Sequence, residues 1–278
     1  MAGTMQGKVA VISGGSTGVG RAVGAQLAEN GAQVVLLARR ADRLETAARE
    51  MAGSVLTIPT DVSSGNSVRA TFAQIEERFG RVDILVNSAG VARIRAIEET
   101  ADEDIHACVG TNLLGPIHTI RSAVPLLRAA GGGDILNISS EITLDHMPLM
   151  AMYAASKHGL NGFTAAMHKE LRGDGIRVAL VILGSISDSA FIENFPGEDR
   201  QRAAPVWEAD GYLTRVGAMK PLPSATVRPG HGPAARHPAR GRAGRGAHPP
   251  GRLRPRDRDH APPIRTMRQP WTPHKSAL

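Results

Sequence analysis

The sequence predicts an α/β fold of the doubly wound type, with one parallel sheet and helices on both of its faces. Short runs rich in Val, Ile and Leu alternate with longer segments whose apolar residues are spaced by three and four, as in successive β-α-β units. The short runs are almost continuously apolar, so we expect them to be buried on both faces. With 278 residues and 42% hydrophobic content, the chain can form a sizeable core.

Six of these runs are candidate strands, and helical segments connect them. The strands are expected at residues 8–13, 33–38, 54–59, 82–87, 133–139 and 176–183. Two connecting segments, residues 20–31 and 66–80, each end in glycine, the residue that most often terminates a helix. Six strands with intervening helices make a single open domain, which we place at residues 5–220.

Residues 221–278 differ in composition from the rest of the chain. They hold eleven Arg, one Lys and two Asp, together with 12 of the 18 prolines, and so account for the whole +7 net charge. They lack apolar periodicity, so we expect an irregular, disordered basic tail. The tail offers only Trp271 for base stacking, so we expect no specific nucleic-acid partner.

The sequence predicts neither a membrane segment nor a metal site. The start MAGTMQGKVAVISGG lacks the plan of a signal peptide, and no run approaches the ~20 apolar residues of a membrane span. Cys108 is alone and cannot form an internal disulfide, which agrees with a reducing compartment. No cluster of His, Cys and carboxylates has metal-ligand spacing. We therefore expect a cytoplasmic protein in which Cys108 packs rather than reacts.

The first candidate strand runs directly into SGGSTGVGRAVG. Gly14, Gly18 and Gly20 let the backbone turn tightly and approach a pyrophosphate, while the next helix offers unpaired N–H groups and its positive dipole end. A tight structural turn is the alternative interpretation. Between the first strand and first helix of such an alternation, however, the cluster predicts a dinucleotide site of the Rossmann type.

The end of the second strand indicates which dinucleotide binds. An acidic side chain there would accept hydrogen bonds from the ribose hydroxyls of NAD, but the chain reads LLARR. Ala38 has no carboxylate to repel a 2′-phosphate, and Arg39, with Arg40, can bind one through charge-assisted hydrogen bonds. The pattern favours NADP(H), with NAD(H) possible; a solvated basic turn without a ligand is the alternative.

Tyr153 and Lys157 stand one helical turn apart in YAASK. They begin a helical pattern, so their side chains share one face. An ammonium within ~4 to 6 Å favours the phenolate, and we therefore expect Lys157 to lower the pKa of Tyr153 from its usual ~10. Such a tyrosine exchanges protons near neutral pH. The alternative is an exposed pair on a helix surface.

Taken together, these motifs resemble the short-chain dehydrogenase/reductase family over roughly residues 5–195. Further signals follow in the family's order: Asp61 after the third strand, NSAG at 87–90, Asn112 in GTNLLG and ISS at 138–140. The resemblance implies an NAD(P)-dependent oxidoreductase that interconverts a ketone or aldehyde and an alcohol by hydride transfer. Asp61 could equally cap the next helix.

The resemblance also implies roles for individual residues. The catalytic residues are expected to be Asn112, Ser140, Tyr153 and Lys157. Ser140 is favoured over Ser139, because its separation from Tyr153 matches the family's, and it would polarise the substrate oxygen. Asn112 would hold a water that relays protons from Lys157, which would also bind the nicotinamide ribose. The expected cofactor-binding residues are Gly14, Ser16, Thr17, Gly18, Val19, Gly20, Arg39, Arg40, Asp61, Val62, Asn87, Ala89, Gly90, Tyr153, Lys157 and Gly184.

The chain departs from the family pattern after the sixth strand. The family has Pro-Gly and then a threonine that binds the nicotinamide carboxamide; here Leu183 precedes Gly184, and Asp188 or Ser189 stands near the threonine position. Family members continue with a substrate lid, here at about residues 185–220, and then a helix and a strand that residues 221–278 cannot form. We hypothesise a reading-frame shift after about Lys220, which would leave the sixth strand as an exposed edge.

Substrate and partners are indicated only broadly. Met147, Leu149 and Met150 precede Tyr153, and the lid offers Phe191, Phe195 and Trp207. If these residues line the site rather than fill the core, the substrate is an apolar ketone, aldehyde or secondary alcohol. The resemblance implies a homodimer or homotetramer, the tetramer being in doubt because of the tail. The alternative function is a non-catalytic or impaired nucleotide sensor whose basic tail binds phosphate.

Overall fold

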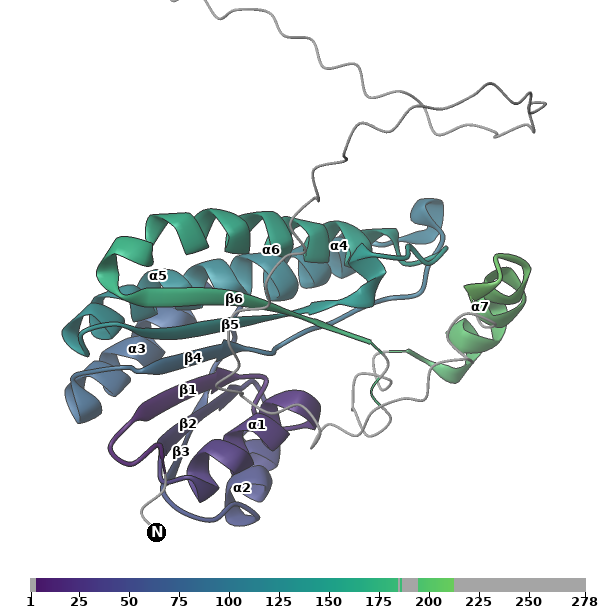
Figure 1. Ribbon diagram of the computed structural model, residues 1–278. Helices are drawn as coiled ribbons and strands as arrows, with labels where there is room; N and C mark the ends of the chain where they lie inside the picture. Colours follow the sequence, from purple (N-terminus) through teal and green to yellow (C-terminus); the bar gives the residue numbers. More distant parts are fainter. Residues whose placement is uncertain (1–3, 185, 187–194, 213–278) are drawn as a thin grey trace, which may run out of the picture. The chain divides into compact units, whose positions relative to one another are not determined.

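The computed structural model describes residues 4–184, 186 and 195–212, and these form the predicted doubly wound α/β fold (Figure 1). Six parallel strands make one sheet in the order β3-β2-β1-β4-β5-β6. Its strands are β1 Val9–Ser13, β2 Gln33–Ala38, β3 Val55–Pro59, β4 Ile84–Asn87, β5 Gly133–Ser140 and β6 Ile176–Leu183. All six predicted strands are therefore confirmed. The predicted tail at 221–278 lies outside the described residues.

Helices cover both faces of the sheet. The described helices are α1 Gly18–Glu29, α2 Ala41–Arg49, α3 Gly65–Phe79, α4 Asp102–Val109, α5 Gly115–Ala129, α6 Ala151–Glu170 and α7 Gly197–Ala209. Short turns of helix lie at η1 Ile97–Glu99, η2 Gly110–Leu114, η3 Glu141–Thr143 and η4 Arg172–Asp174. None of the described helices is long and apolar enough to cross a membrane.

Two apolar cores separate the layers. On one face, Val11, Leu85 and Ile135 of the sheet pack with residues of α3, α5 and α6. On the other face, Ile12 and Leu36 pack with residues of α1 and α2. Strands β1, β2 and β4 are buried almost throughout, as their continuous apolar sequences predict.

Strand β6 does not follow the expectation of burial on both faces. It is the edge of the described sheet, and along it Ile176 and Val178 are buried whereas Arg177 and Ala179 are exposed. The buried side chains contact the core under α3, α5 and α6. The helices of the opposite face, α1 and α2, pack against the β1 and β2 side of the sheet, so among the described residues no helix shields this part of β6.

A buried chain of polar side chains fixes α6 on the sheet. Thr119 Oγ1 of α5 donates to Asn87 Oδ1 over 2.7 Å, and Asn87 Nδ2 donates to Asn137 Oδ1 over 2.8 Å. Asn137 Nδ2 then donates to Thr164 Oγ1 of α6 over 2.9 Å. All four side chains are at most 3% exposed. Each link is satisfied, so the chain joins α5, β4, β5 and α6 without leaving a polar group unpaired.

We expect Asn137→Ala to lower the free energy of unfolding by about 3 kcal/mol, because the variant leaves the buried Asn87 Nδ2 group without its acceptor and removes the hydrogen bond that Thr164 Oγ1 accepts. Chemical denaturation measures this loss. The control Asn66→Ala, at an exposed position of α3, should change stability by no more than ~0.5 kcal/mol. Equal effects of the two substitutions would contradict the structural role of the polar chain.

Candidate active site

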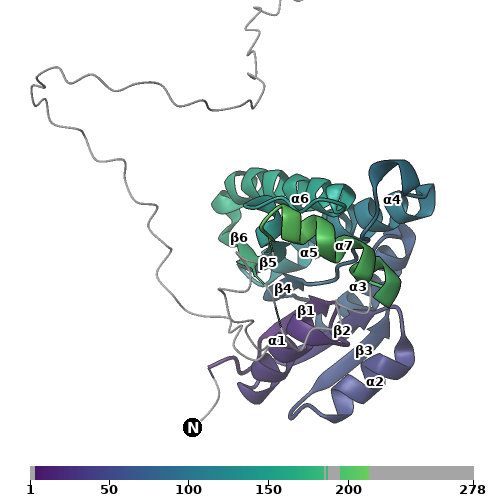
Figure 2. The same cartoon turned by 90° about the vertical axis from the view of Figure 1, so that its right-hand side faces the viewer.

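A pocket of about 1050 Å³ opens at the carboxyl ends of the strands. The strand order reverses between β1 and β4, and at this switch point the loops after the two strands diverge, which leaves a crevice. Figure 2 looks onto this edge of the sheet, with α7 in front of it. The pocket wall is built by the loops that follow β1, β2, β3 and β4, the ends of β5 and β6, the start of α6, and α7.

The loop after β1 forms a close-packed cradle at one end of the pocket. At Gly14, where φ is 69°, a Cβ atom would lie 2.7 Å from the backbone nitrogen of Ala89, and at Gly20 it would lie 2.4 Å from the Gly14 carbonyl oxygen. Only glycine fits at these two positions. Thr17 occupies the N-cap position of α1 without a side-chain cap, so the first N–H groups of the helix can receive a phosphate.

Arg39 and Arg40 are exposed at the rim of the pocket, where β2 leads into α2. On the neighbouring loop, Asp61 Oδ1 accepts hydrogen bonds from Ser63 N at 3.0 Å and from Ser63 Oγ at 2.7 Å. The N-cap of α3 is Ser64, whose side chain accepts from Ser67 N. The structure thus corrects one alternative for Asp61: this residue does not cap α3, because its carboxylate instead stabilises the turn before the helix.

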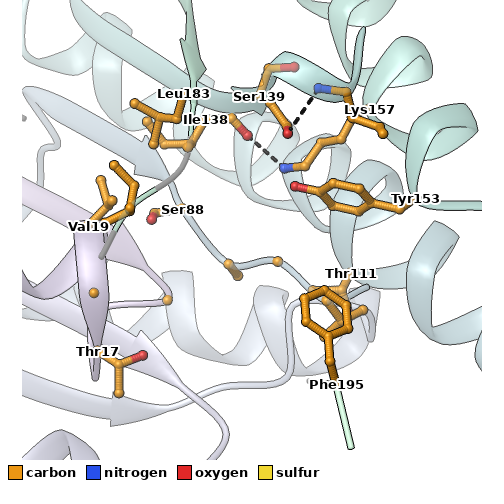
Figure 3. A pocket seen from close by; sticks show the side chains of 18 of the residues that line it. Thr17, Val19, Ser88, Thr111, Ile138, Ser139, Tyr153, Lys157, Leu183 and Phe195 are labelled. Atoms are coloured by element: carbon orange, nitrogen blue, oxygen red, sulfur yellow. Dashed lines mark hydrogen bonds between the residues drawn. The ribbon is translucent and has the colours of Figure 1, made fainter. Parts of the chain in front are cut away.

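Tyr153 and Lys157 lie side by side in the first turns of α6, at the opposite end of the pocket from Thr17 (Figure 3). The Lys157 ammonium is 5.8 Å from the centre of the Tyr153 ring and donates to the Ile138 carbonyl oxygen over 2.8 Å. Both side chains are buried, at 7% and 4% exposure. The alternative of an exposed surface pair is therefore wrong.

The pKa values of this pair depart from the sequence expectation. Burial raises the pKa of Tyr153, and the hydrogen bond from the Ser140 hydroxyl lowers it by less, so that the net value is about 12. Burial also lowers the pKa of Lys157 to about 8. The expected lowering of the Tyr153 pKa by the ammonium is therefore not found in the protein without a ligand, because removing the phenol from water outweighs its neighbours.

The two serines at the end of β5 point to different partners. Ser139 Oγ donates to Asn161 Oδ1 of α6 over 2.6 Å, so this hydroxyl is used in holding the helix. Ser140 Oγ accepts from Ile142 N at 3.3 Å and hydrogen-bonds the Tyr153 phenol. The geometry therefore places Ser140, rather than Ser139, beside the phenol.

Asn112 is fully buried in η2, a π-helical turn between α4 and α5. Its Oδ1 accepts from Val91 N at 2.9 Å, and its Nδ2 donates to Val91 O at 2.8 Å and to Ser156 Oγ at 3.0 Å. Gly90 lies between this amide and the ammonium, since a Cβ atom there would be 3.6 Å from Asn112 Oδ1 and 4.0 Å from Lys157 Nζ. A π-bulge at such a position often marks a functional site.

The structure brings most of the predicted residues into one pocket wall. Its predicted members are Gly14, Ser16, Thr17, Gly18, Val19, Arg39, Arg40, Asp61, Val62, Ala89, Gly90, Ser140, Tyr153, Lys157 and Gly184. Gly20, Asn87 and Asn112 lie behind this wall. Asn87 belongs instead to the buried polar chain that fixes α6.

The apolar residues expected near the substrate divide in two groups. Met147, Met150, Phe195 and Trp207 line the pocket, whereas Leu149 packs in the small core beneath it. Phe191, Asp188 and Ser189 lie outside the described residues. Among the described residues, no group of three His, Cys, Asp or Glu side chains could hold a metal ion.

The sequence patterns did not indicate several polar residues of the pocket wall, which are Thr60, Thr111, Glu141, Arg200 and Tyr212. Glu141 directly follows Ser140, and Tyr212 comes after α7 and donates to Glu141 Oε1 over 3.4 Å. Trp207 Nε1 of α7 also donates to the Pro148 carbonyl oxygen over 2.9 Å. Glu141 could have been predicted as a site residue because it directly follows Ser140. No local pattern, however, indicated that α7 would bring Tyr212 to Glu141.

A nucleotide cradle and a buried Tyr-Lys pair in one pocket define a dinucleotide-binding α/β protein. The short chain dehydrogenase family model matches residues 8–198. The chain is similar to 3-oxoacyl-[acyl-carrier-protein] reductase of Bos taurus, with 37% identity over 179 residues that cover 64% of this chain and 76% of that protein. It is also similar to D-beta-hydroxybutyrate dehydrogenase of Rhizobium meliloti (strain 1021), with 34% identity over 200 residues, 70% of this chain and 78% of that protein.

A solved structure agrees with these sequence similarities. The crystal structure of a metagenomic short-chain oxidoreductase in complex with NADP superimposes with a TM-score of 0.63 at 35% identity, covering 66% of this chain and 84% of that one. The chain therefore belongs to the short-chain dehydrogenase/reductase family of oxidoreductases.

We expect Lys157→Met to raise the free energy of unfolding of the ligand-free protein by about 2 kcal/mol at pH 7, because the variant no longer buries an ammonium. The pKa of Lys157 is lowered to about 8, below the ~10.4 of an unfolded chain. Between these values the unfolded chain binds the extra proton, so wild-type stability rises with pH. The advantage of the variant should therefore shrink between pH 8 and 10.5.

Chemical denaturation at pH 7 and pH 10 measures both effects. Lys169→Met is a matched control, since Lys169 is exposed at the other end of α6. It should change stability little at either pH. A Lys157→Met protein that is less stable than the wild type at pH 7 would contradict the cost that burial places on this ammonium.

Proposed function

We propose that the protein is an NADP(H)-dependent reductase or dehydrogenase that interconverts a ketone or aldehyde and an alcohol. The observation that carries this proposal is the continuity of one pocket, with the glycine cradle at one end and Tyr153, Ser140 and Lys157 at the other. A volume of about 1050 Å³ exceeds what a small ligand needs, so a dinucleotide and a substrate fit together.

The residues present suit a bound dinucleotide. Gly14, Gly18 and the first N–H groups of α1 would receive the pyrophosphate, Asp61 and Val62 would adjoin the adenine, and Lys157 would bind the nicotinamide ribose. When bound, the nicotinamide supplies or accepts the hydride. Binding the ribose also gives the buried ammonium a second polar partner besides Ile138 O, which lowers the cost of its charge.

Tyr153 is the group that moves the proton in this proposal. Its raised pKa, about 12, keeps the phenol protonated at neutral pH, so Tyr153 Oη can donate to a carbonyl oxygen during reduction. The Ser140 hydroxyl, which already hydrogen-bonds the phenol, can stabilise the charge that develops on that oxygen. Alcohol oxidation requires the phenolate, so its rate should rise with pH.

Arg39 supports the choice of NADP(H). β2 ends in Ala38 rather than in a carboxylate, and the guanidinium groups of Arg39 and Arg40 stand at the pocket rim, where a 2′-phosphate could form charge-assisted hydrogen bonds. The alternative, a non-catalytic nucleotide sensor, leaves the buried Tyr153 and Lys157 pair without a purpose.

Tyr153→Phe should lower kcat for ketone reduction by ~10²–10⁴-fold, because the variant loses the proton donor but keeps the ring that fills the pocket. NADPH affinity, measured by fluorescence titration, should stay within about twofold of the wild type. A variant with the full rate would remove Tyr153 from the mechanism.

Arg39→Ala should raise the Kd for NADPH roughly 10- to 100-fold, because charge-assisted hydrogen bonds to the 2′-phosphate are lost. The Kd for NADH should change little, since NADH has no phosphate at that position. Arg78→Ala, on the exposed surface of α3, serves as the control of equal charge change. Equal losses of affinity for both dinucleotides would contradict a phosphate contact.

A further inference from the structure

The carboxylate of Glu141 stands where three elements of the pocket meet. Glu141 begins η3, directly after the end of β5. Its Oε1 accepts from the Tyr212 hydroxyl at 3.4 Å, and its Oε2 is 3.0 Å from the position that a Cβ atom on Gly184 would take. The ends of β5, β6 and the segment after α7 therefore converge on this one acidic group.

The charge of Glu141 acts on the proposed reaction centre. Among the described residues of the pocket wall, two are acidic: Asp61 lies on the loop after β3 and binds Ser63, and Glu141 directly follows Ser140, near Tyr153. Its negative charge contributes, after burial, to the raised pKa of Tyr153. The rest of this end of the pocket combines the apolar side chains of Met147, Met150, Phe195 and Trp207 with the polar side chains of Ser140, Lys157 and Arg200.

We propose that Glu141 determines substrate specificity. It would select carbonyl compounds that carry a hydroxyl group on the carbon next to the carbonyl, and it would reject compounds in which a carboxylate is attached to the carbonyl carbon. This inference rests on the proposed function, because a substrate whose carbonyl oxygen is protonated by Tyr153 would have the carbon next to its carbonyl beside Glu141. A carboxylate accepts a hydrogen bond from a hydroxyl group, and charge makes that bond stronger than a neutral one. It repels a second carboxylate held directly beside it.

Two other roles for Glu141 make different predictions. If the carboxylate only holds Tyr212 and the lid in place, removing the Tyr212 hydroxyl should have the same effect as changing Glu141. If it bound the cofactor instead, changing it should alter NADPH affinity for every substrate equally. The specificity role alone changes the ratio between substrates while NADPH affinity stays constant.

The experiment compares three ketones that share a phenyl group. Propiophenone is the apolar reference, 2-hydroxyacetophenone replaces its terminal methyl group by a hydroxyl, and benzoylformate places a carboxylate beside the carbonyl. The measured quantity is kcat/KM with NADPH for the wild type, Glu141→Leu, Glu141→Gln and Tyr212→Phe. Glu77→Gln, at an exposed position of α3, is the control of equal charge change.

In the wild type we expect 2-hydroxyacetophenone to be preferred over propiophenone by roughly 10-fold or more, the effect of one charge-assisted hydrogen bond. Glu141→Leu should abolish this preference. Glu141→Gln should raise kcat/KM for benzoylformate about 10-fold relative to propiophenone, because the repulsion between carboxylates is gone. It should also move the alkaline limb of the pH–rate profile to lower pH, because the charge that raises the Tyr153 pKa is removed. Glu77→Gln should change neither ratio.

The outcomes separate this inference from the proposed function. Reduction of propiophenone by the wild type with unchanged substrate ratios in Glu141→Leu overturns the role of Glu141 and leaves the function standing. The same ratios in Tyr212→Phe as in Glu141→Leu assign Glu141 to holding the lid and overturn its direct role. A wild type that binds NADPH but reduces none of the three ketones, nor oxidises their alcohols, overturns both.

Discussion

Lys157 places a positive charge where water hardly reaches, and much of the active-site architecture can be understood from that constraint. A buried ammonium is costly unless polar groups surround it. The Ile138 carbonyl at the end of β5 is one such group, and Gly90 lies between the ammonium and the Asn112 amide. The buried ammonium therefore lowers the stability of the free protein. In the proposed function, a hydrogen bond to a ribose hydroxyl of the bound dinucleotide would reduce this loss.

Holding that charge in register requires a rigid frame, which the sheet and the buried amides provide. Ile138 and Ser140 are fixed by the pairing of β5 with β6, where they lie opposite Val181 and Leu183. On the other side of the contact, α6 is held through the hydrogen bond between Asn137 and Thr164. Helix and strand therefore keep a constant separation, and the positions of phenol, ammonium and hydroxyl follow from it.

Local sequence patterns were sufficient to predict the strands and to predict which neighbouring side chains share a helix face. The apolar runs indicated every strand, and the spacing of Tyr153 and Lys157 indicated that they share a helix face. The sign of the pKa shift at Tyr153 was predicted wrongly, because it depends on total burial, to which distant segments contribute. The exposed side of β6 and the meeting of Glu141 with Tyr212 were likewise invisible, since they depend on which helix covers which part of the sheet.

The π-helical turn at η2 makes the position of the Asn112 side chain depend on the number of residues in that turn. From Asp102 to Ala129 the chain runs as one helical path, α4, η2 and α5, and the wider turn accommodates one residue more than regular α-helix would. Deleting one residue there would close the turn to regular α-helix, while α4 and α5 on either side would keep the faces that they present to the sheet. The side chains of the turn itself would shift, so Asn112 would lose its hydrogen bonds to Val91 and Ser156, whereas Thr119 would keep its bond to Asn87. The one additional residue of the path therefore serves to direct the amide of Asn112 toward Val91.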